Sequence, residues 1–329
     1  MVKFMNILSD IRLLLNIPDI ELTEQVQSLW SGYGEIIRCK SKCTGQRYIV
    51  KVIAPENASD HPRGWNTSTS HQRKVKSYQV EANFYNKYAQ FTDHHCKTPK
   101  LIESKISDDV TLLVMEDLDA AGFSIRKNEA DWHSLSLAIR WLAYFHAKFM
   151  GHSADALWPI GTYWHLNTRQ DELSAMPESN YKTYAQAINN TLNNAKYQTL
   201  VHGDAKFENL CFHQKGDDVA AVDFQYIGRG SGVKDLAYLV GSCLNEEKLI
   251  EFDDLILNEY LTHLKQALNI YKITVDVDAL TKETTELYPV AWADFYRFLL
   301  GWNPQSWKIC DFMKMKAQLG LTIIISSDH

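Results

Sequence analysis

The sequence lacks the features that mark membrane, secreted and nucleic-acid-binding proteins. No apolar stretch is long enough to cross a bilayer, and Asp10 and Arg12 interrupt the apolar amino-terminal segment where a signal peptide needs a continuous core. The net charge is −6 and no basic run is present, which argues against binding to nucleic acid or a membrane surface. We therefore expect a soluble, cytoplasmic protein without nucleic-acid or membrane partners.

Cysteine is also scarce. The six cysteines show neither paired CxxC spacing nor the density of a secreted scaffold, so reduced thiols are expected. Residues 93–96 spell DHHC, the motif of protein acyltransferases. Those enzymes span the membrane several times, and this sequence has no span, so we interpret the match as accidental.

Two short segments carry most of the chemical information. Residues 201–212 read VHGDAKFENLCF, and AVDFQ occupies residues 221–225. Asp204 is followed by Lys206 and Asn209, and Asp223 stands nineteen residues beyond Asp204. The order and spacing resemble the protein-kinase signature, in which Asp is followed by Lys and Asn and then by a strand that ends in Asp-Phe-Gly. Each pair alone is typical of a turn or a strand end, but together they favour a phosphoryl-transfer centre.

The residue types fit that chemistry. A phosphoryl group in transfer carries spread negative charge, so the protein must hold Mg²⁺ with oxygen ligands and orient a hydroxyl. Asn209 and Asp223 are the expected metal ligands. Asp204 is the expected base that accepts the hydroxyl proton, and Lys206 is expected to neutralise charge on the phosphate.

The amino-terminal half contains candidates for nucleotide binding. Gly32 and Gly34 begin a predicted strand pair whose glycines allow backbone N–H groups to approach phosphates, and residues 47–53 form the next strand. Lys51 stands in this apolar strand and needs an anionic partner, because burying an unpaired ammonium is costly. Glu81, on a helix whose packed face is predicted from helical spacing, is the candidate.

A further strand at residues 111–115 precedes the expected interlobe hinge. In this position a kinase holds the adenine edge with backbone groups, here those of Met115, Glu116 and Leu118. The length of the chain favours two lobes. We place a nucleotide-binding lobe at residues 1–118 and a catalytic, acceptor-binding lobe at 119–329.

The second lobe is predicted to be mainly helical. Apolar residues at helical spacing indicate helices over 131–150, with Gly151 as C-cap, and over 181–195, 234–244, 249–268 and 283–300. His146 is interpreted as a satisfied core histidine.

Residues 55–77 contain clustered Gly, Pro, Asn, Ser and Thr and are predicted to form a long loop that has room for a short helix. Arg63, Arg73 and Lys74 could close over phosphate or acceptor. A solvated basic loop is the alternative interpretation.

The acceptor is expected to be a small molecule. Eleven residues separate Asp223 from the helical DLAYLV segment, and the sequence contains no Ala-Pro-Glu. A protein kinase needs a long activation segment there to display a peptide.

The motifs HGDAKFEN, VDFQ and DLAYLV resemble the aminoglycoside phosphotransferase and choline kinase superfamily, and the DFQ variant is most similar to the ecdysteroid kinase-like group. The resemblance implies an α+β, bilobal protein-kinase-like fold with a β-rich amino-terminal lobe, use of ATP and Mg²⁺, and phosphorylation of a hydroxyl on a metabolite. Choline kinases typically have DFE, which counts against choline, and Lys206 replaces a different residue of many members.

Aromatic residues near the carboxy terminus suggest an acceptor site. Trp292 and Tyr296 are four residues apart, on a helix face that differs from the predicted core face, and Asp294 lies between them. Such a face suits a flat apolar or cationic acceptor. If these residues are structural, the second cluster at Trp158, Tyr163 and Trp164 is the alternative.

Two other functions remain open. A catalytically silent nucleotide-binding or scaffold protein on the same fold is disfavoured because the chain retains Lys51, Glu81, Asp204, Asn209 and Asp223 together. A protein kinase is disfavoured by the short segment after Asp223.

Overall fold

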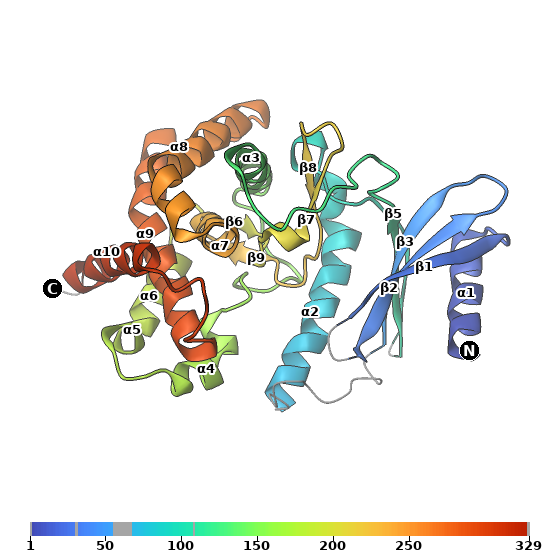
Figure 1. The fold of residues 1–329 in the computed structure, drawn as a ribbon, viewed down its shortest axis with the longest axis horizontal. Helices are drawn as coiled ribbons and strands as arrows, with labels where there is room; N and C mark the ends of the chain where they lie inside the picture. The colour runs from blue at the N-terminus through green and yellow to red at the C-terminus, as the bar shows by residue number, and fades with distance from the viewer. Residues whose placement is uncertain (1, 30–31, 55–67, 108, 328–329) are drawn as a thin grey trace. The chain divides into compact units, whose positions relative to one another are not determined.

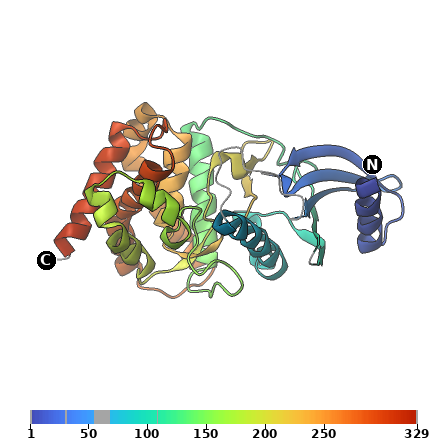
Figure 2. The same ribbon diagram turned by 90° about the horizontal axis from the view of Figure 1, so that it is seen from below.

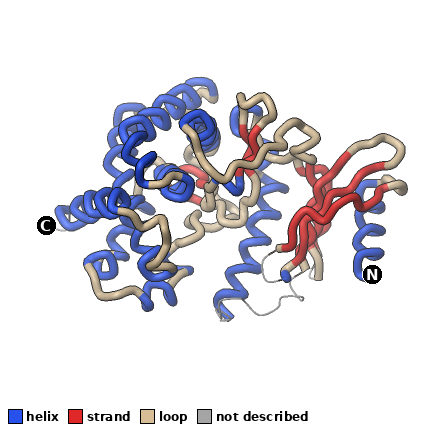
Figure 3. The backbone as a smooth tube through the Cα atoms, viewed as in Figure 1, coloured by secondary structure: helices blue, strands red, loops and turns tan. Residues whose placement is uncertain are grey.

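The computed structural model describes residues 2–29, 32–54, 68–107 and 109–327. The chain forms two compact units, one of Met1–Phe91 with Thr98–Ile125 and one of Thr92–Lys97 with Arg126–His329. The described part of the first unit contains a five-stranded sheet and two α-helices, whereas the second unit is mainly helical, as Figure 3 shows. The α+β class, with a small β-rich part and a larger mainly helical part, is the predicted one.

The first unit is built on an antiparallel sheet. Its described strands lie in the order β1 (Ile20–Ser28), β2 (Gly34–Ser41), β3 (Arg47–Ile53), β5 (Thr111–Glu116) and β4 (Leu101–Ile106). Val50, Val52 and Val114 are buried on one side of the sheet. Helix α1 (Val2–Leu15) adds Ile11 to the same core (Figure 1). Strands β2, β3 and β5 follow the prediction, whereas β1, β4 and α1 were not predicted.

Helix α2 (Ser68–Lys87) corrects the loop predicted at residues 55–77. Residues 68–77, with Arg73 and Lys74, belong to the helix. The physical reason is that the glycines and prolines end at Gly64, so nothing interrupts helical backbone from Ser68 onwards. Residues 55–67, which include Arg63, lie outside the described part of the chain.

The second unit is mainly helical, as Figure 2 shows, and its first α-helix is α3 (Trp132–Lys148). A capping box of Asp131 and Ser134 begins α3. The other helices are α4 (Gln170–Ala175), α5 (Asn180–Thr183), α6 (Ala185–Asn193), α7 (Val233–Cys243), α8 (Glu246–Ile270), α9 (Val277–Trp302) and α10 (Asp311–Ser327).

Two helix predictions need correction. The helix predicted over 181–195 is divided at Tyr184, whose N–H closes α5 by donating to the carbonyl of Asn180. Helix α3 ends at Lys148, before the predicted Gly151 cap. Gly151 has φ 76° and donates its N–H to the carbonyl of Gln198, so it turns the chain away from the helix. Helix α10 was not predicted.

Two short antiparallel strand pairs flank the segments that carry the predicted site residues. Strand β6 (Thr199–Val201) pairs with β9 (Gly228–Gly230), and β7 (Leu210–Phe212) pairs with β8 (Val219–Ala221). Both pairs are antiparallel, so the segments between β6 and β7 and between β8 and β9 meet at one place.

The DHHC residues have a structural role. Asp93 caps the 3-10 helix His94–Cys96 by accepting the N–H of His95 at 2.9 Å, and its carboxylate also pairs with Lys148 at 2.8 Å. Cys96 is fully buried. All six cysteines are free thiols, as expected. In the part of the chain that the structure describes, no helix combines the length and apolar character of a membrane span.

Candidate active site

The segment between β6 and β7 carries Asp204, Lys206 and Asn209, and Asp223 lies two residues after the end of β8. The N–H of Val222 donates to the carbonyl of Asn209 at 2.9 Å, which joins the two segments. Asn209 closes the 3-10 helix Phe207–Asn209 just before β7. The hairpin β7–β8 therefore brings together four side chains that the sequence assigned to one centre.

Asp204 is almost entirely buried, with 6 % of its surface exposed. Its Oδ1 accepts a hydrogen bond from the Tyr238 hydroxyl at 3.1 Å, and its Oδ2 accepts one from Asn209 Nδ2 at 3.1 Å. The Lys206 ammonium lies 3.3 Å from Oδ2. Burial raises the pKa of Asp204, and the charge of Asp223 adds to this rise while Lys206 opposes it. A carboxylate with a raised pKa is a better proton acceptor, which suits a general base.

Asn209 and Asp223 offer oxygen atoms to a cation. The Asn209 amide nitrogen donates to the carbonyl of Asp204 at 2.8 Å and to its carboxylate, which turns the amide oxygen away from Asp204. Asp223 has φ 68° and accepts a hydrogen bond from Gln225 Nε2 at 2.6 Å. One carboxylate and one amide oxygen fit Mg²⁺, which takes one or two protein carboxylates and completes its shell with phosphates and water.

A larger protein ligand set is not found. Among the described residues there is no group of three or more His, Cys, Asp and Glu side chains placed to hold a metal.

Asp235, on α7, holds the backbone of the loop. Its carboxylate accepts the N–H groups of His202 at 2.5 Å and Gly203 at 2.9 Å, and it lies 3.1 Å from His146 Nε2. Although burial raises the pKa of Asp235, the hydrogen bond and charge of His146 lower it below its ordinary value. His146 also bonds the Tyr260 hydroxyl at 2.8 Å, so the prediction of a satisfied core histidine is confirmed.

Gly203 is required at the centre of this loop. It has φ 81°, and a Cβ at this position would lie 2.1 Å from the carbonyl oxygen of Tyr226. A larger residue would therefore separate the loop from the segment that follows Asp223.

In the first unit, Lys51 and Glu81 form the expected pair. The Lys51 ammonium lies 2.6 Å from Glu81 Oε2, and both side chains are buried. Strand β3 contributes the lysine and α2 the glutamate. The lysine also lies 5.7 Å from the ring centroid of Tyr78.

The other predicted nucleotide residues have local structural roles. Gly34 has φ 147°, and a Cβ there would lie 1.9 Å from the carbonyl oxygen of Val52, so β2 and β3 need this glycine. Gly32 donates its N–H to the carbonyl of Leu29 at 3.3 Å. Met115 and Leu118 are buried, and the N–H of Glu116 donates to the carbonyl of Lys100 at 2.9 Å. Their contacts with a nucleotide stay a prediction.

Trp292 and Asp294 have packing roles in place of the open face expected for them. Trp292 is fully buried and its ring centroid lies 5.8 Å from that of Phe312 on α10. Asp294 pairs with Arg297 Nη2 at 2.7 Å and accepts the Trp164 indole N–H at 2.9 Å. The reason is that α10 packs along α9 and covers the face that helical spacing left open. Tyr296 is partly exposed.

The second aromatic cluster lies against the segments that carry Asp204 and Asp223. Trp158 donates its indole N–H to the carbonyl of Gln225 at 2.8 Å, and the backbone N–H of Tyr163 donates to the carbonyl of Gly203 at 2.8 Å. Tyr163 meets Tyr226 edge to face, with the ring centroids 5.1 Å apart, and both rings are partly exposed. This cluster, and not Trp292, is adjacent to Asp204.

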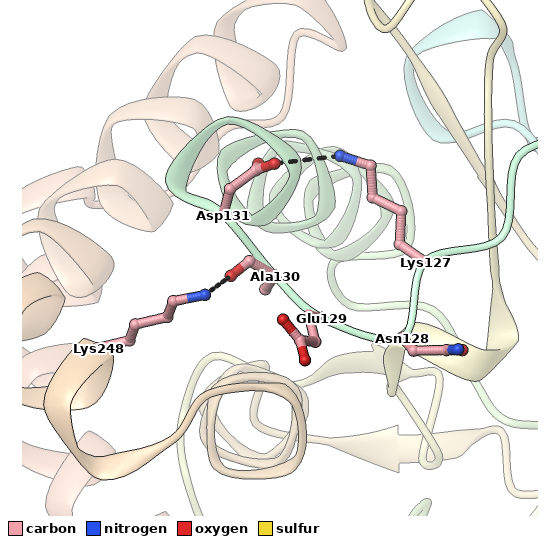
Figure 4. Close-up of a pocket in the computed structure, with 6 residues that line it drawn as sticks. All are labelled: Lys127, Asn128, Glu129, Ala130, Asp131 and Lys248. Atoms are coloured by element: carbon pink, nitrogen blue, oxygen red, sulfur yellow. Dashed lines mark hydrogen bonds and ion pairs between the residues drawn. The ribbon is translucent and has the colours of Figure 1, made fainter.

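A shallow pocket lies elsewhere, at the amino-terminal end of α3 (Figure 4). Residues 127–131 and Lys248 line it. Its two lysines already have partners, because Lys127 lies 3.3 Å from the Asp131 carboxylate and Lys248 donates to the carbonyl of Ala130 at 2.7 Å. None of the predicted site residues lines this pocket.

Sequence reasoning did not assign three residues that shape the centre. Gln225, Asp235 and Tyr238 were noted only as letters of the DFQ and DLAYLV motifs. A signal was present for Asp235, because an aspartate that leads directly into the apolar run LAYLV needs a partner if it is buried.

A protein-family model matches the part of the chain that carries the candidate site. Residues 160–273 match the model of the ecdysteroid kinase-like family, and this range contains the Asp204 loop, Asp223 and Asp235. The resemblance to the ecdysteroid kinase-like group, drawn from the HGDAKFEN, VDFQ and DLAYLV motifs, is thereby confirmed over this range. A comparison with curated proteins gives no match.

Solved structures of small-molecule kinases are similar over most of the chain. An aminoglycoside-3'-phosphotransferase of type VIII is 16% identical, with a TM-score of 0.46, and the alignment covers 86% of this chain and 98% of that one. An aminoglycoside phosphotransferase from Streptomyces rimosus, solved with ADP and streptomycin, is 13% identical with a TM-score of 0.44, covering 88% and 99%. A choline kinase from Streptococcus pneumoniae is 14% identical with a TM-score of 0.41, covering 99% and 100%.

Proposed function

We propose that the protein is an ATP- and Mg²⁺-dependent kinase that transfers the γ-phosphate of ATP to a hydroxyl of a small metabolite. The observation that carries this proposal is the environment of Asp204. A buried carboxylate with a raised pKa is held by Tyr238 and Asn209, beside a lysine and next to a second aspartate. A structural aspartate needs no such proximity to a second negative charge, whereas a base beside a metal ligand does.

The chain's residues divide the work as follows. Asp204 accepts the proton of the acceptor hydroxyl, and its two hydrogen bonds fix which oxygen lone pairs remain for that proton. The Lys206 ammonium offsets negative charge that develops on the transferred group. Although burial lowers the pKa of Lys206, the charges of Asp204 and Asp223 raise it overall, which keeps the lysine charged.

The metal and the nucleotide have separate candidate ligands. Asn209 Oδ1 and the Asp223 carboxylate would hold Mg²⁺, which when bound neutralises charge on the phosphates. Gln225 orients Asp223 through its amide nitrogen. Lys51, positioned by Glu81, is assigned to the nucleotide phosphates, and Gly32, Gly34, Met115, Glu116 and Leu118 are assigned to nucleotide binding through their backbone.

Several observations favour a small-molecule acceptor. Helix α7 begins at Val233, ten residues after Asp223, so the described chain has no long segment there to display a peptide. The matching family and the similar structures are named for ecdysteroid, aminoglycoside and choline kinases. We therefore propose a metabolite alcohol and not a protein as the acceptor.

The test begins with the metal. ATP affinity should be measured by calorimetry with and without Mg²⁺ in the wild type, Asp223→Ala and Asp217→Ala. Asp217 is a matched control because it is exposed on the same hairpin, with 64% of its side chain accessible. We expect the Mg²⁺-dependent gain in ATP affinity to disappear in Asp223→Ala and to persist in Asp217→Ala. Equal affinities in all three proteins contradict the metal assignment.

Transfer itself should be measured with labelled ATP against ecdysteroids, choline, aminoglycosides and a generic protein substrate. Label on a small alcohol supports the proposal. Label only on protein indicates a protein kinase, and Mg²⁺-ATP binding without any transfer indicates a silent nucleotide-binding protein.

A further inference from the structure

Lys308 lies beside the candidate base, although no motif marks it. It belongs to the segment between α9 and α10, and its ammonium lies 5.4 Å from the ring centroid of Tyr238. Tyr238 is the residue whose hydroxyl donates to Asp204. A single aromatic side chain therefore separates the Lys308 ammonium from the carboxylate that is proposed to receive the acceptor's proton.

Three aromatic rings surround the charge of Lys308. Besides Tyr238, the ring centroids of Trp307 and Phe295 lie 5.9 Å and 6.0 Å from the ammonium nitrogen. An ammonium within about 6 Å of aromatic faces is attracted by their negative electrostatic potential, and sets of such rings recognise quaternary ammonium ligands. Here the chain's own lysine occupies the position that a ligand cation would take.

The rings also differ in exposure, which gives the site an open side. Phe295 and Tyr238 are buried, whereas Trp307 is 63% exposed and Lys308 is partly exposed. Burial lowers the pKa of Lys308, and the charges of Glu208 and Asp204 limit this decrease. A ligand cation would have to displace the lysine from the rings, and a tethered group competes at a high effective concentration.

The charges around Asp204 also disfavour a cationic acceptor. The Lys206 ammonium lies 3.3 Å from the Asp204 carboxylate, and the Lys308 ammonium lies over the ring of Tyr238, whose hydroxyl donates to Asp204. An acceptor ammonium directed to this place would meet two cations. A hydroxyl, carbonyl or carboxylate oxygen would instead find donors, because an ammonium has three N–H groups and no acceptor.

We propose that Lys308 is a specificity-determining residue that fills the aromatic site formed by Tyr238, Phe295 and Trp307. The acceptor is accordingly an uncharged or anionic alcohol, and ammonium alcohols are excluded. This inference rests on the proposed function in one respect, namely that the acceptor hydroxyl is brought to Asp204.

Choline and dimethylbutanol, its uncharged isostere in which carbon replaces nitrogen, test the proposal directly. Their dissociation constants should be measured by ligand-observed NMR, without ATP, for the wild type, Lys308→Ala, Lys308→Gln and Lys314→Ala. Lys314 is the control because it is an exposed lysine on the neighbouring helix, paired with Asp311. The melting temperature of each variant establishes that it is folded.

We expect the wild type and Lys314→Ala to bind the isostere at least as tightly as choline. In Lys308→Ala the affinity for choline should rise about tenfold or more, because the vacated rings attract the quaternary ammonium. Lys308→Gln should show a smaller gain, since its uncharged side chain still takes up part of the space. An unchanged choline affinity in folded Lys308→Ala or Lys308→Gln overturns the proposal, as does a wild type that prefers choline.

The two proposals fail separately. If the wild type does not bind Mg²⁺-ATP but Lys308→Ala gains choline affinity, the kinase proposal fails and the aromatic site stands. If Mg²⁺-ATP binds normally and Lys308→Ala gains nothing, only the role of Lys308 is wrong.

Discussion

Asp204 and Asp294 are two buried carboxylates of the same unit whose pKa values move in opposite directions. They are 6% and 4% exposed. Each accepts a hydrogen bond from an aromatic side chain, Tyr238 for Asp204 and Trp164 for Asp294. Each also has a cationic neighbour. Yet the pKa of Asp204 is raised and that of Asp294 is lowered.

The difference comes from the other charges. Burial raises the pKa of both carboxylates, but Asp294 has Arg297, which donates from Nε at 3.2 Å and from Nη2 at 2.7 Å, and also the charge of Lys234. Asp204 has one lysine and, against it, the negative charge of Asp223. A fully compensated carboxylate remains ionised, and Asp294 in this state attaches Trp164 to α9, whereas a partly compensated carboxylate can take a proton. The ionic partners, and not burial, therefore separate a structural aspartate from a candidate base.

Exchanging each aspartate for asparagine should give opposite results. Asp204→Asn should lower the transfer rate about a hundredfold or more, because the amide cannot accept the proton, while ATP affinity is kept. Its free energy of unfolding should be unchanged or higher, since the fold disfavours the charged form of Asp204. Asp294→Asn should instead lower the free energy of unfolding by about 3 kcal/mol, because Arg297 loses its buried partner.

Single-turnover assays and urea unfolding measure both effects. If Asp204→Asn turns over at the wild-type rate, Asp204 is not the base. If the transfer rate per folded molecule also falls a hundredfold in Asp294→Asn, the distinction between a candidate base at Asp204 and a structural carboxylate at Asp294 is wrong.

Asp235 combines features of both carboxylates, because it is structural but holds the catalytic loop. Asp235→Asn should lower the free energy of unfolding by about 2 kcal/mol, since the two loop N–H groups lose a charged acceptor. It should also slow transfer about tenfold through misplacement of Asp204. Circular dichroism melting and the transfer rate, corrected for folded protein, are the measurements. A stability loss with an unchanged rate would show that the loop keeps its geometry without this carboxylate.

In the first unit, the Lys51–Glu81 pair tests the same distinction between a structural and a functional charged residue. Lys51→Met should weaken ATP binding about tenfold and lower the free energy of unfolding by about 3 kcal/mol, because Glu81 is left buried and unpaired. The double variant Lys51→Met with Glu81→Leu should regain most of the stability but not the ATP affinity. Calorimetric titration with ATP and urea unfolding separate the two quantities. Full recovery of ATP affinity in the double variant would assign Lys51 a purely structural role.

Substitution of His165 should have the smallest effect on stability and transfer rate at neutral pH. Burial lowers its pKa to about 4 from the ordinary value of 6.5. Because the unfolded chain binds the proton at a higher pH than the folded chain, stability is full above about pH 6.5 and is lost as the pH falls towards 4, by up to about 1.4 kcal/mol per pH unit. His165→Phe should remove that slope without changing the transfer rate at pH 7. If the free energy of unfolding depends on pH in the same way in the wild type and in His165→Phe, His165 is not the source of the pH dependence.

Local sequence patterns predicted much of the architecture and the centre. The apolar alternation of β3 and the helical spacing around Glu81 predicted the elements that now carry the Lys51–Glu81 pair. The HGD and DFQ segments predicted which residues gather at the β7–β8 hairpin. Strand β1 was missed because it lies at the sheet edge and is mostly exposed, so it lacks the alternation of a half-buried strand.

The aromatic residues show the limit of such patterns. Helical spacing correctly separates the faces of α9, but it cannot tell which face another helix covers. Helix α10 takes the Trp292 face, and Gly320 permits this close contact because a Cβ there would lie 2.1 Å from the carbonyl oxygen of Pro289. Of the two predicted aromatic clusters, the one at Trp158 and Tyr163 contacts the segments that carry Asp204 and Asp223.

Residue spacing alone was therefore sufficient to predict that Asp204, Lys206, Asn209 and Asp223 lie together, because they belong to one loop and one hairpin whose geometry is local. The contacts that tune this chemistry depend on packing between distant segments. Tyr238 reaches Asp204 from α7, Asp235 reaches the loop backbone from the same helix, and Lys308 reaches Tyr238 from beyond α9. No periodicity encodes such meetings, since they arise only when the helices pack and water is removed from the carboxylate, which is also what raises the pKa of Asp204.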